Sequence, residues 1–249
     1  MIALPVGFSF RTLISLHPLI LQRQDCQFQA ILGFCDSDSY SLESTQEEFL
    51  HPEEIVYLKQ LKLDKTRSEF LRSRYLVKKA LATYPLQEEP TEIQIGKGIF
   101  QQPLLLTRYH YQLDLSISHH TTLAACLIFP QQHPMSLDVE VCNPSVIALT
   151  KNEVTEHEKK LYCNTRESET IFFTRLWTIK EALSKVLKTG MMVPFHKLET
   201  ENMTYQGNIV TSYYTDFIQY KAISFQRKDS ICTIALPRAS SLLFSTQIT

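Results

Sequence analysis

Short segments of alternating apolar and polar residues constrain the fold of this chain more than any other feature. Alternation puts every second side chain on one face of a strand, and turn residues separate such segments. In 112–118, for example, Leu113, Leu115 and Ile117 alternate with polar residues. We predict strands at 28–34, 92–95, 112–118, 122–129, 135–141, 209–214, 220–225 and 231–236.

Segments with helical periodicity lie between these strands, and we predict helices at 52–61, 66–83, 153–163 and 167–188. Pro52 and the two glutamates after it favour a helix N-terminus, and Gly190 is predicted to cap the last helix. Helices and short strands recur in both halves, with no glycine-rich βαβ fingerprint. The pattern predicts an α+β fold with mainly antiparallel sheets. We place the junction in the turn at 130–134, which separates halves 1–132 and 133–249.

The composition excludes several classes of protein. A chain of 249 residues, 44% hydrophobic and 20% charged, can bury a normal globular core. Its net charge of −1 provides no basic field for nucleic acid or an anionic membrane, so any phosphate site must be local. The six cysteines form no C-x-x-C pair, which favours reduced thiols over disulfides or zinc. Segment 1–21 lacks a basic start and is interrupted by Arg11 and His17, so we expect a soluble, cytoplasmic protein.

Asp138 and Glu140 form the first candidate site. On a strand they point to the same face, while Val139 points into the packing. Two neighbouring carboxylates repel each other unless a cation lies between them, and hard oxygen ligands suit Mg²⁺. A solvent-facing strand edge with two acids is the alternative, and it is the commoner origin of a lone D-x-E pair.

The predicted helix 167–188 carries the second candidate site. Trp177, Lys180, Glu181 and Lys185 occupy neighbouring faces there. In a functional interpretation Glu181 is a third carboxylate near the metal and Lys185 binds a phosphate. The alternative is a Glu181–Lys185 surface pair worth about 0.5 kcal/mol, with Trp177 as a core residue. Helical periodicity leaves both open.

The run S-I-S-H-H at 116–120 is the third candidate, at a strand end. Ser118 and His119 could hold a phosphate, His119 best when protonated, whereas a polar turn with exposed histidines is the alternative. No G-x-S-x-G elbow supports a serine hydrolase. Adjacent histidines splay apart on a strand, so His119 and His120 do not suit zinc.

A basic stripe is the fourth candidate. Arg67, Leu71, Arg74 and Lys78 recur at 4-3-4 spacing on one face of the predicted helix 66–83. Such a stripe usually indicates a solvated face. It would also suit an anionic cofactor or an acidic partner.

Taken in their order, these motifs resemble those of the Sfp-type 4′-phosphopantetheinyl transferases. The runs are L-D-L-S-I-S-H-H at 113–120, M-S-L-D-V-E at 135–140 and F-F-T-R-L-W-T-I-K-E-A-L-S-K at 172–185. The family patterns read roughly N-x-S-H-S, G-I-D-x-E and W-x-x-K-E-A-x-x-K. The resemblance covers about 67–194, and the third block is the most specific.

The resemblance implies an α/β-type pseudo-dimer of two similar halves, each a small, mainly antiparallel sheet with helices, with coenzyme A and a metal at their junction. Asp138, Glu140 and Glu181 would hold Mg²⁺, with Mn²⁺ as an alternative. Ser118 and His119 would contact the 3′-phosphate end of coenzyme A. Further phosphate contacts would come from Lys185, at the pyrophosphate, and from Lys180, Arg67 and Arg74.

Three departures from the family pattern stand out. Gln102, in Gln101-Gln102-Pro103, stands where the family has the lysine of G-K-P. His120 replaces the last serine of S-H-S, and Ser136 replaces the glycine before the hydrophobic residue and Asp138. The first departure removes an expected cation from the nucleotide side, while the three carboxylates remain.

The activity implied is transfer of 4′-phosphopantetheine from coenzyme A to a serine of an acyl or peptidyl carrier protein, with release of 3′,5′-ADP. Glu181 would be the general base, and Lys185 would neutralise the departing phosphate. A monomer is implied, with no nucleic-acid or membrane partner, and the carrier would contact loops after Asn143 and near 191–195. Two alternatives remain. One is an inactive homologue that binds coenzyme A or a carrier, and the other is an unrelated metal-dependent phosphohydrolase. The pathway stays open among fatty-acid, polyketide and non-ribosomal peptide synthesis.

Overall fold

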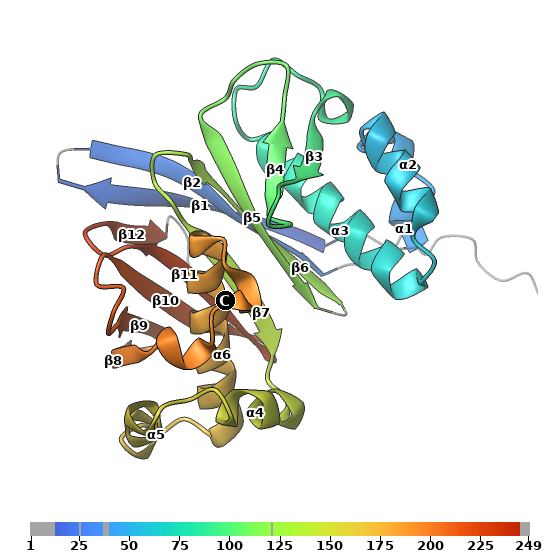
Figure 1. The fold of residues 1–249 in the computed structure, drawn as a ribbon. Helices are drawn as coiled ribbons and strands as arrows, with labels where there is room; N and C mark the ends of the chain where they lie inside the picture. The colour runs from blue at the N-terminus through green and yellow to red at the C-terminus, as the bar shows by residue number, and fades with distance from the viewer. Residues whose placement is uncertain (1–12, 25, 37–39, 121, 245–249) are drawn as a thin grey trace, which may run out of the picture.

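Two five-stranded antiparallel sheets, each with a long helix, make up the fold (Figure 1). The computed structural model describes residues 13–24, 26–36, 40–120 and 122–244, so residues 1–12 of the N-terminal segment and part of the polar loop after 36 lie outside the described residues. No helix among the described residues is long and apolar enough to span a membrane. The predicted α+β class with mainly antiparallel sheets is confirmed.

The first sheet has the strand order β12-β1-β2-β6-β5. Its strands are β1 (Leu13–Arg23), β2 (Cys26–Asp36), β5 (Leu113–His120), β6 (Leu123–Pro130) and β12 (Ser241–Phe244). The helices α1 (Tyr40–Glu43), α2 (Pro52–Gln60) and α3 (Asp64–Leu81) accompany it, as does a two-stranded hairpin of β3 (Gln94–Lys97) and β4 (Pro103–Leu106). Leu76, Val77 and Ala80 of α3 pack on the outer face of this sheet.

The second sheet has the order β7-β11-β10-β9-β8. Its strands are β7 (Ser136–Val141), β8 (Thr200–Gln206), β9 (Ile209–Tyr214), β10 (Tyr220–Arg227) and β11 (Ser230–Pro237). Its helices are α4 (Pro144–Lys151), α5 (Glu156–Cys163) and α6 (Glu169–Leu187). Short 3₁₀ turns occur at Gln46–Glu48, Pro90–Glu92, Gly190–Met192 and Phe195–Lys197.

The inner faces of the two sheets share one apolar core. Phe34 of β2 meets Phe225 of β10 edge to face, with ring centroids 6.4 Å apart. Beside them, Arg227 forms a two-pronged ion pair with Asp36, whose shorter contact is 2.6 Å. Strand β12 follows the second sheet in the chain but pairs with β1 of the first. The two halves are therefore joined by packing, by the Arg227–Asp36 ion pair and by strand β12, which the second half contributes to the first sheet.

Two local predictions were wrong. Gly190 does not cap α6; the cap is Lys188, in the left-handed conformation with φ 57°, and its N–H bonds back to Lys185 and Ser184. The segment after Asn143 is not a loop but α4, because the Asn143 side chain accepts hydrogen bonds from the first free N–H groups of that helix. None of the six cysteines, all of which lie in the described residues, is paired in a disulfide.

A buried histidine at the junction makes stability depend on pH. His133 is 1% exposed, its Nε2 lies 2.7 Å from Ser240 Oγ, and burial lowers its pKa. Protonation of His133 is thus less favourable in the folded state than in the unfolded chain. The contribution of neutral His133 to the free energy of unfolding is therefore fully present above pH 6.5 and is lost as the pH falls through the lowered pKa. We expect His133→Gln to lose less of its free energy of unfolding than wild type does between pH 7 and pH 5, as measured by urea denaturation. Exposed His110→Gln is the control, and equal losses in both variants would contradict the prediction.

Candidate active site

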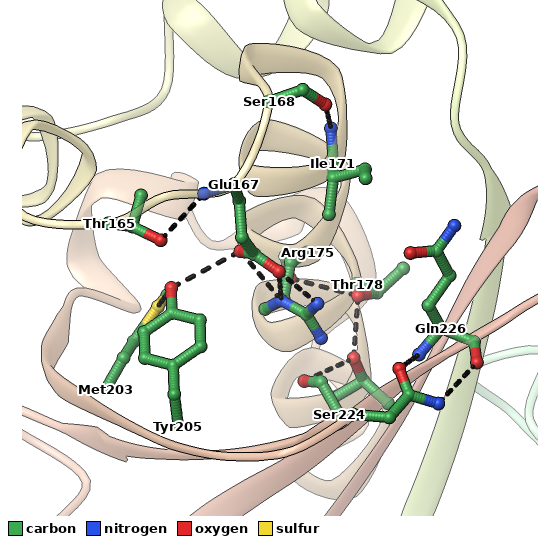
Figure 2. Close-up of polar contacts among 12 residues, drawn as sticks. Thr165, Glu167, Ser168, Ile171, Arg175, Thr178, Met203, Tyr205, Ser224 and Gln226 are labelled. Atoms are coloured by element: carbon green, nitrogen blue, oxygen red, sulfur yellow. Dashed lines mark hydrogen bonds and ion pairs between the residues drawn. The ribbon is translucent and has the colours of Figure 1, made fainter.

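Helix α6 carries three of the predicted site residues, and polar contacts fix its first half (Figure 2). The Ser168 hydroxyl accepts from Ile171 N–H at 3.4 Å and caps the helix. Arg175 forms a buried ion pair with Glu167, to which the Tyr205 hydroxyl of β8 donates at 3.3 Å. These contacts hold the N-terminal half of α6 against the second sheet.

A chain of hydroxyls continues this attachment. Thr178 Oγ1 of α6 lies 2.7 Å from Thr233 Oγ1 of β11, which lies 2.9 Å from Ser224 Oγ of β10. Ser136, which replaces the family glycine, donates to the Ala182 carbonyl and so ties β7 to α6. The second half of the helix, with Glu181 and Lys185, is thereby held beside β7.

Asp138 is the centre of the site. It is 5% exposed, and its Oδ1 accepts from Ser118 Oγ of β5 at 2.8 Å and from Lys185 Nζ of α6 at 2.7 Å. Its Oδ2 is buried without a hydrogen-bond partner. Unpaired buried carboxylate oxygens are costly unless something else binds them. All three sequence motifs therefore meet at one side chain.

The other two carboxylates are electrostatically coupled to Asp138. Burial first, and then the charges of Asp138 and Glu181, raise the pKa of Glu140 to about 7, while Lys185 opposes them. Burial and then Asp138 also raise the pKa of Glu181. Val139, between the two strand acids, is 1% exposed in the core, as the alternation predicted. The acids are therefore not a solvated strand edge.

The donor chemistry of this site fits a hard divalent cation. Three carboxylates that disfavour each other's charge are relieved by a cation, and one oxygen of Asp138 is unpartnered. Within the described residues, however, no three metal-ligating side chains form a ready cluster, and Lys185 already pairs with Asp138. The residue types at this site suit Mg²⁺, and the ion pair between Lys185 and Asp138 would have to break for the ion to bind Asp138.

Burial lowers the pKa of both histidines at the end of β5. His119 Nδ1 lies 3.7 Å from Glu69 Oε2 of α3, and burial lowers its pKa despite that carboxylate. His120, which replaces the family serine, reaches the second sheet, with Nε2 3.1 Å from Ser230 Oγ. His119 can therefore serve as a hydrogen-bonding group, and burial disfavours the protonated form that the sequence interpretation assigned to it.

Most of the predicted basic stripe is buried. Arg74 and Lys78 both pair with Glu54 of α2, at 3.1 and 3.3 Å, and Glu54 is 3% exposed. Arg67 pairs with Glu43 and donates to the Leu58 carbonyl at 3.0 Å. A solvated face is thus the wrong interpretation for Arg74 and Lys78, which join α2 to α3.

Lys180 lies away from the site. Its side chain is fully buried, with Nζ 2.8 Å from Glu158 Oε1 of α5 and 2.8 Å from the Phe195 carbonyl. Trp177, nearby, packs its ring 5.0 Å from that of Phe195, as a core residue would. In this buried position Lys180 is not accessible to a phosphate. The geometry therefore does not support the prediction that Lys180 contacts the cofactor.

Two cavities flank the site and share part of their walls. One, of about 360 Å³, is lined by Lys185, Ser116, Ser136 and Gln102, and the other, of about 260 Å³, by Arg74, His119 and Lys97. Gln101, Pro103 and Ile117 line both. A long ligand could therefore pass from α3 over the hairpin to α6. Sequence reasoning missed Lys97, although its place just before the G-K-P-like segment was a usable signal.

Residues 134–235 match the family model described as the 4′-phosphopantetheinyl transferase superfamily. The predicted resemblance is confirmed over these residues. The segment includes Asp138, Glu140, Glu181 and Lys185. It spans β7 to β11 and the helices between them.

Two individual proteins are similar to parts of the chain. The 4′-phosphopantetheinyl transferase gsp of Aneurinibacillus migulanus is 28% identical over 104 residues, which are 39% of this chain and 43% of that protein. A holo-(acyl-carrier-protein) synthase from Bacillus anthracis str. Ames, solved in complex with CoA (3′,5′-ADP), covers 47% of this chain and 97% of its own, at 17% identity and a TM-score of 0.34. So low a TM-score supports no conclusion about this chain.

Proposed function

We propose that this protein transfers the 4′-phosphopantetheine group of coenzyme A to a serine of an acyl or peptidyl carrier protein, depends on Mg²⁺ and releases 3′,5′-ADP. One observation carries the proposal: Ser118 and Lys185 both donate to Oδ1 of Asp138, so three motifs from distant parts of the chain meet. The superfamily match over 134–235 supports the interpretation of this cluster as the site of phosphopantetheinyl transfer.

The reaction requires one bond to form and one to break. The carrier serine oxygen attacks the phosphorus that bears the pantetheine arm, and the bond from that phosphorus to the bridging oxygen of 3′,5′-ADP breaks. The serine proton goes to a base, for which we propose Glu181, because its carboxylate lies close enough to Asp138 for the two charges to interact. Lys185 would neutralise charge on the departing phosphate.

We propose that Asp138, Glu140 and Glu181 hold the Mg²⁺ ion, with Mn²⁺ as an alternative. When bound, the ion would neutralise the pyrophosphate oxygens and the charge that develops on them. In this proposal Lys185 leaves Asp138 and turns to the phosphate, since Mg²⁺ would compete with the ammonium for the same carboxylate oxygen.

Coenzyme A is long enough to need both cavities. We propose that its nucleotide end lies in the groove beside α3, near His119 and Arg74, and that its arm runs past Lys185. Ser118 lines neither cavity, and its hydroxyl donates to Asp138, so a contact with the 3′-phosphate would require Ser118 to leave that bond. Arg67 and Lys180 are left out, because each is already paired with a glutamate and lines neither cavity.

The remaining proposals concern the state of the protein. We propose that it acts as a monomer whose halves are 1–132 and 133–249, because both sheets and their shared core come from one chain. Free thiols suit the reducing cytoplasm. The second candidate function is binding of coenzyme A or a carrier without transfer, which the Lys185–Asp138 pair and Gln102 favour.

The test is loading of a carrier. We expect the full chain, incubated with coenzyme A, Mg²⁺ and a panel of purified apo carrier proteins, to add one phosphopantetheine to a serine of at least one carrier. Intact-mass spectrometry detects the addition, and a chelator should abolish it. Full loading in the presence of the chelator would contradict the proposed dependence on Mg²⁺. Release of pantetheine phosphate to water would indicate a hydrolase, and binding without either product an inactive homologue.

A further inference from the structure

The groove beside α3 has few charged groups on its walls. It has a volume of about 260 Å³ and lies between α3, the β3–β4 hairpin and the end of β5. Its charged or chargeable side chains, tyrosine aside, are Glu69, Arg74, Lys97 and His119. Any anion that enters must be balanced by these.

Arg74 and His119 are both held by other groups. Arg74, 8% exposed, is paired with Glu54 and donates to the Ile95 carbonyl at 3.2 Å, which fixes its guanidinium in the protein. His119 faces Glu69 at 3.7 Å, and burial lowers its pKa, which disfavours the charged form of the imidazole. Neither brings a freely movable positive charge to the groove.

Lys97 differs from both. It is exposed at the end of β3, directly across the hairpin from Pro103. Its Nζ donates to the Tyr57 hydroxyl at 3.1 Å and lies 5.0 Å from the centre of that ring. Among the described residues no carboxylate forms an ion pair with Lys97, and the bond to Tyr57 uses one of its three N–H donors.

Position 102, where the family pattern has lysine, serves another purpose in this chain. Gln102 Oε1 accepts from Phe100 N–H at 3.0 Å and closes the hairpin loop, which an ammonium could not do. Gln102 lines the cavity of Lys185, while the groove beside α3 is lined by Lys97. The cation of this hairpin therefore comes from β3.

We propose that Lys97 binds a phosphate at the nucleotide end of coenzyme A, as the cation that position 102 does not supply, with Tyr57 holding its stem against α2. This proposal rests on the proposed function. A charged hydrogen bond to phosphate from a partly exposed lysine corresponds to roughly a tenfold change in affinity.

Calorimetric titration with 3′,5′-ADP tests the assignment in the full chain. We expect Lys97→Gln to raise the Kd about tenfold and to flatten its dependence on salt, while Lys97→Arg stays close to wild type. In the loading assay the loss should fall on KM for coenzyme A. Lys79→Gln is the matched control, because Lys79 Nζ also lies over a tyrosine, 5.3 Å from the Tyr75 ring centre, but outside the groove.

The outcomes separate the two proposals. If wild type binds the bisphosphate and loads a carrier while Lys97→Gln behaves like Lys79→Gln, the Lys97 assignment is overturned and the function stands. If wild type does neither, both are overturned. A Lys97→Gln loss with an unchanged unfolding temperature, restored by arginine, supports the assignment.

Discussion

Replacing Lys180 with methionine is expected to lower the free energy of unfolding by about 3–5 kcal/mol. Lys180 and Glu158 are each 0% exposed, and their ion pair of 2.8 Å joins α6 to α5. Glu158 also accepts from Thr200 N–H of β8 at 2.9 Å. Removing the ammonium leaves this carboxylate buried without its cation, which costs more than the pair itself contributes. Urea denaturation measures the change.

The double variant Lys180→Met, Glu158→Gln is the matched control. Because it removes the orphan charge, it should regain a large part of the lost stability. Lys180→Met should also leave KM for coenzyme A near the wild-type value in the folded fraction, since Lys180 lines neither cavity. Unchanged stability together with a raised KM would instead make Lys180 a phosphate contact.

Helical phase alone is enough to separate Lys180 from Lys185. Five residues at 100° each put the two side chains about 140° apart on α6, so they cannot both face one ligand. The family-like pattern K-E-A-x-x-K names both without this distinction. Burial then decides which is which: Lys180 points to α5, and Lys185 to β7.

The predictable strands are those whose apolar residues reflect burial, at alternate positions in β9 and at every position from Ser230 to Leu236 in β11. Segment 209–214 is β9 with the predicted bounds, and 231–236 lies inside β11. Strand β8 was missed because it is an edge strand in which only Thr200 is buried, so its sequence carries no apolar alternation. Strand β12 was missed because its four residues become a strand only by pairing with β1, more than 200 residues earlier.

Tertiary contacts also decided the partners of the site. The spacing of Glu181 and Lys185 suggests a pair along the helix, yet Lys185 bonds to Asp138, 47 residues away in the chain. Likewise Arg74 and Lys78 look like a solvated stripe until α2 brings Glu54 over them. Periodicity gives the face of a helix, whereas the element that covers that face comes from the whole fold.

Replacing Asp138 with asparagine is expected to reduce carrier loading by about 100-fold or more, with the fold intact. Asparagine keeps the shape of the side chain and can still accept from Ser118 and Lys185, so packing survives. It removes the negative charge at the point where all three motifs meet, and with it the oxygen pair proposed for Mg²⁺. The loss should fall on kcat and be only partly restored by excess Mg²⁺, as measured by intact-mass time courses.

Exposed Asp216→Asn, a substitution of the same kind away from both cavities, should load carriers like wild type. An Asp138→Asn protein that is stably folded and loads carriers at the wild-type rate would therefore remove Asp138 from the reaction, and with it the observation on which the proposed function rests.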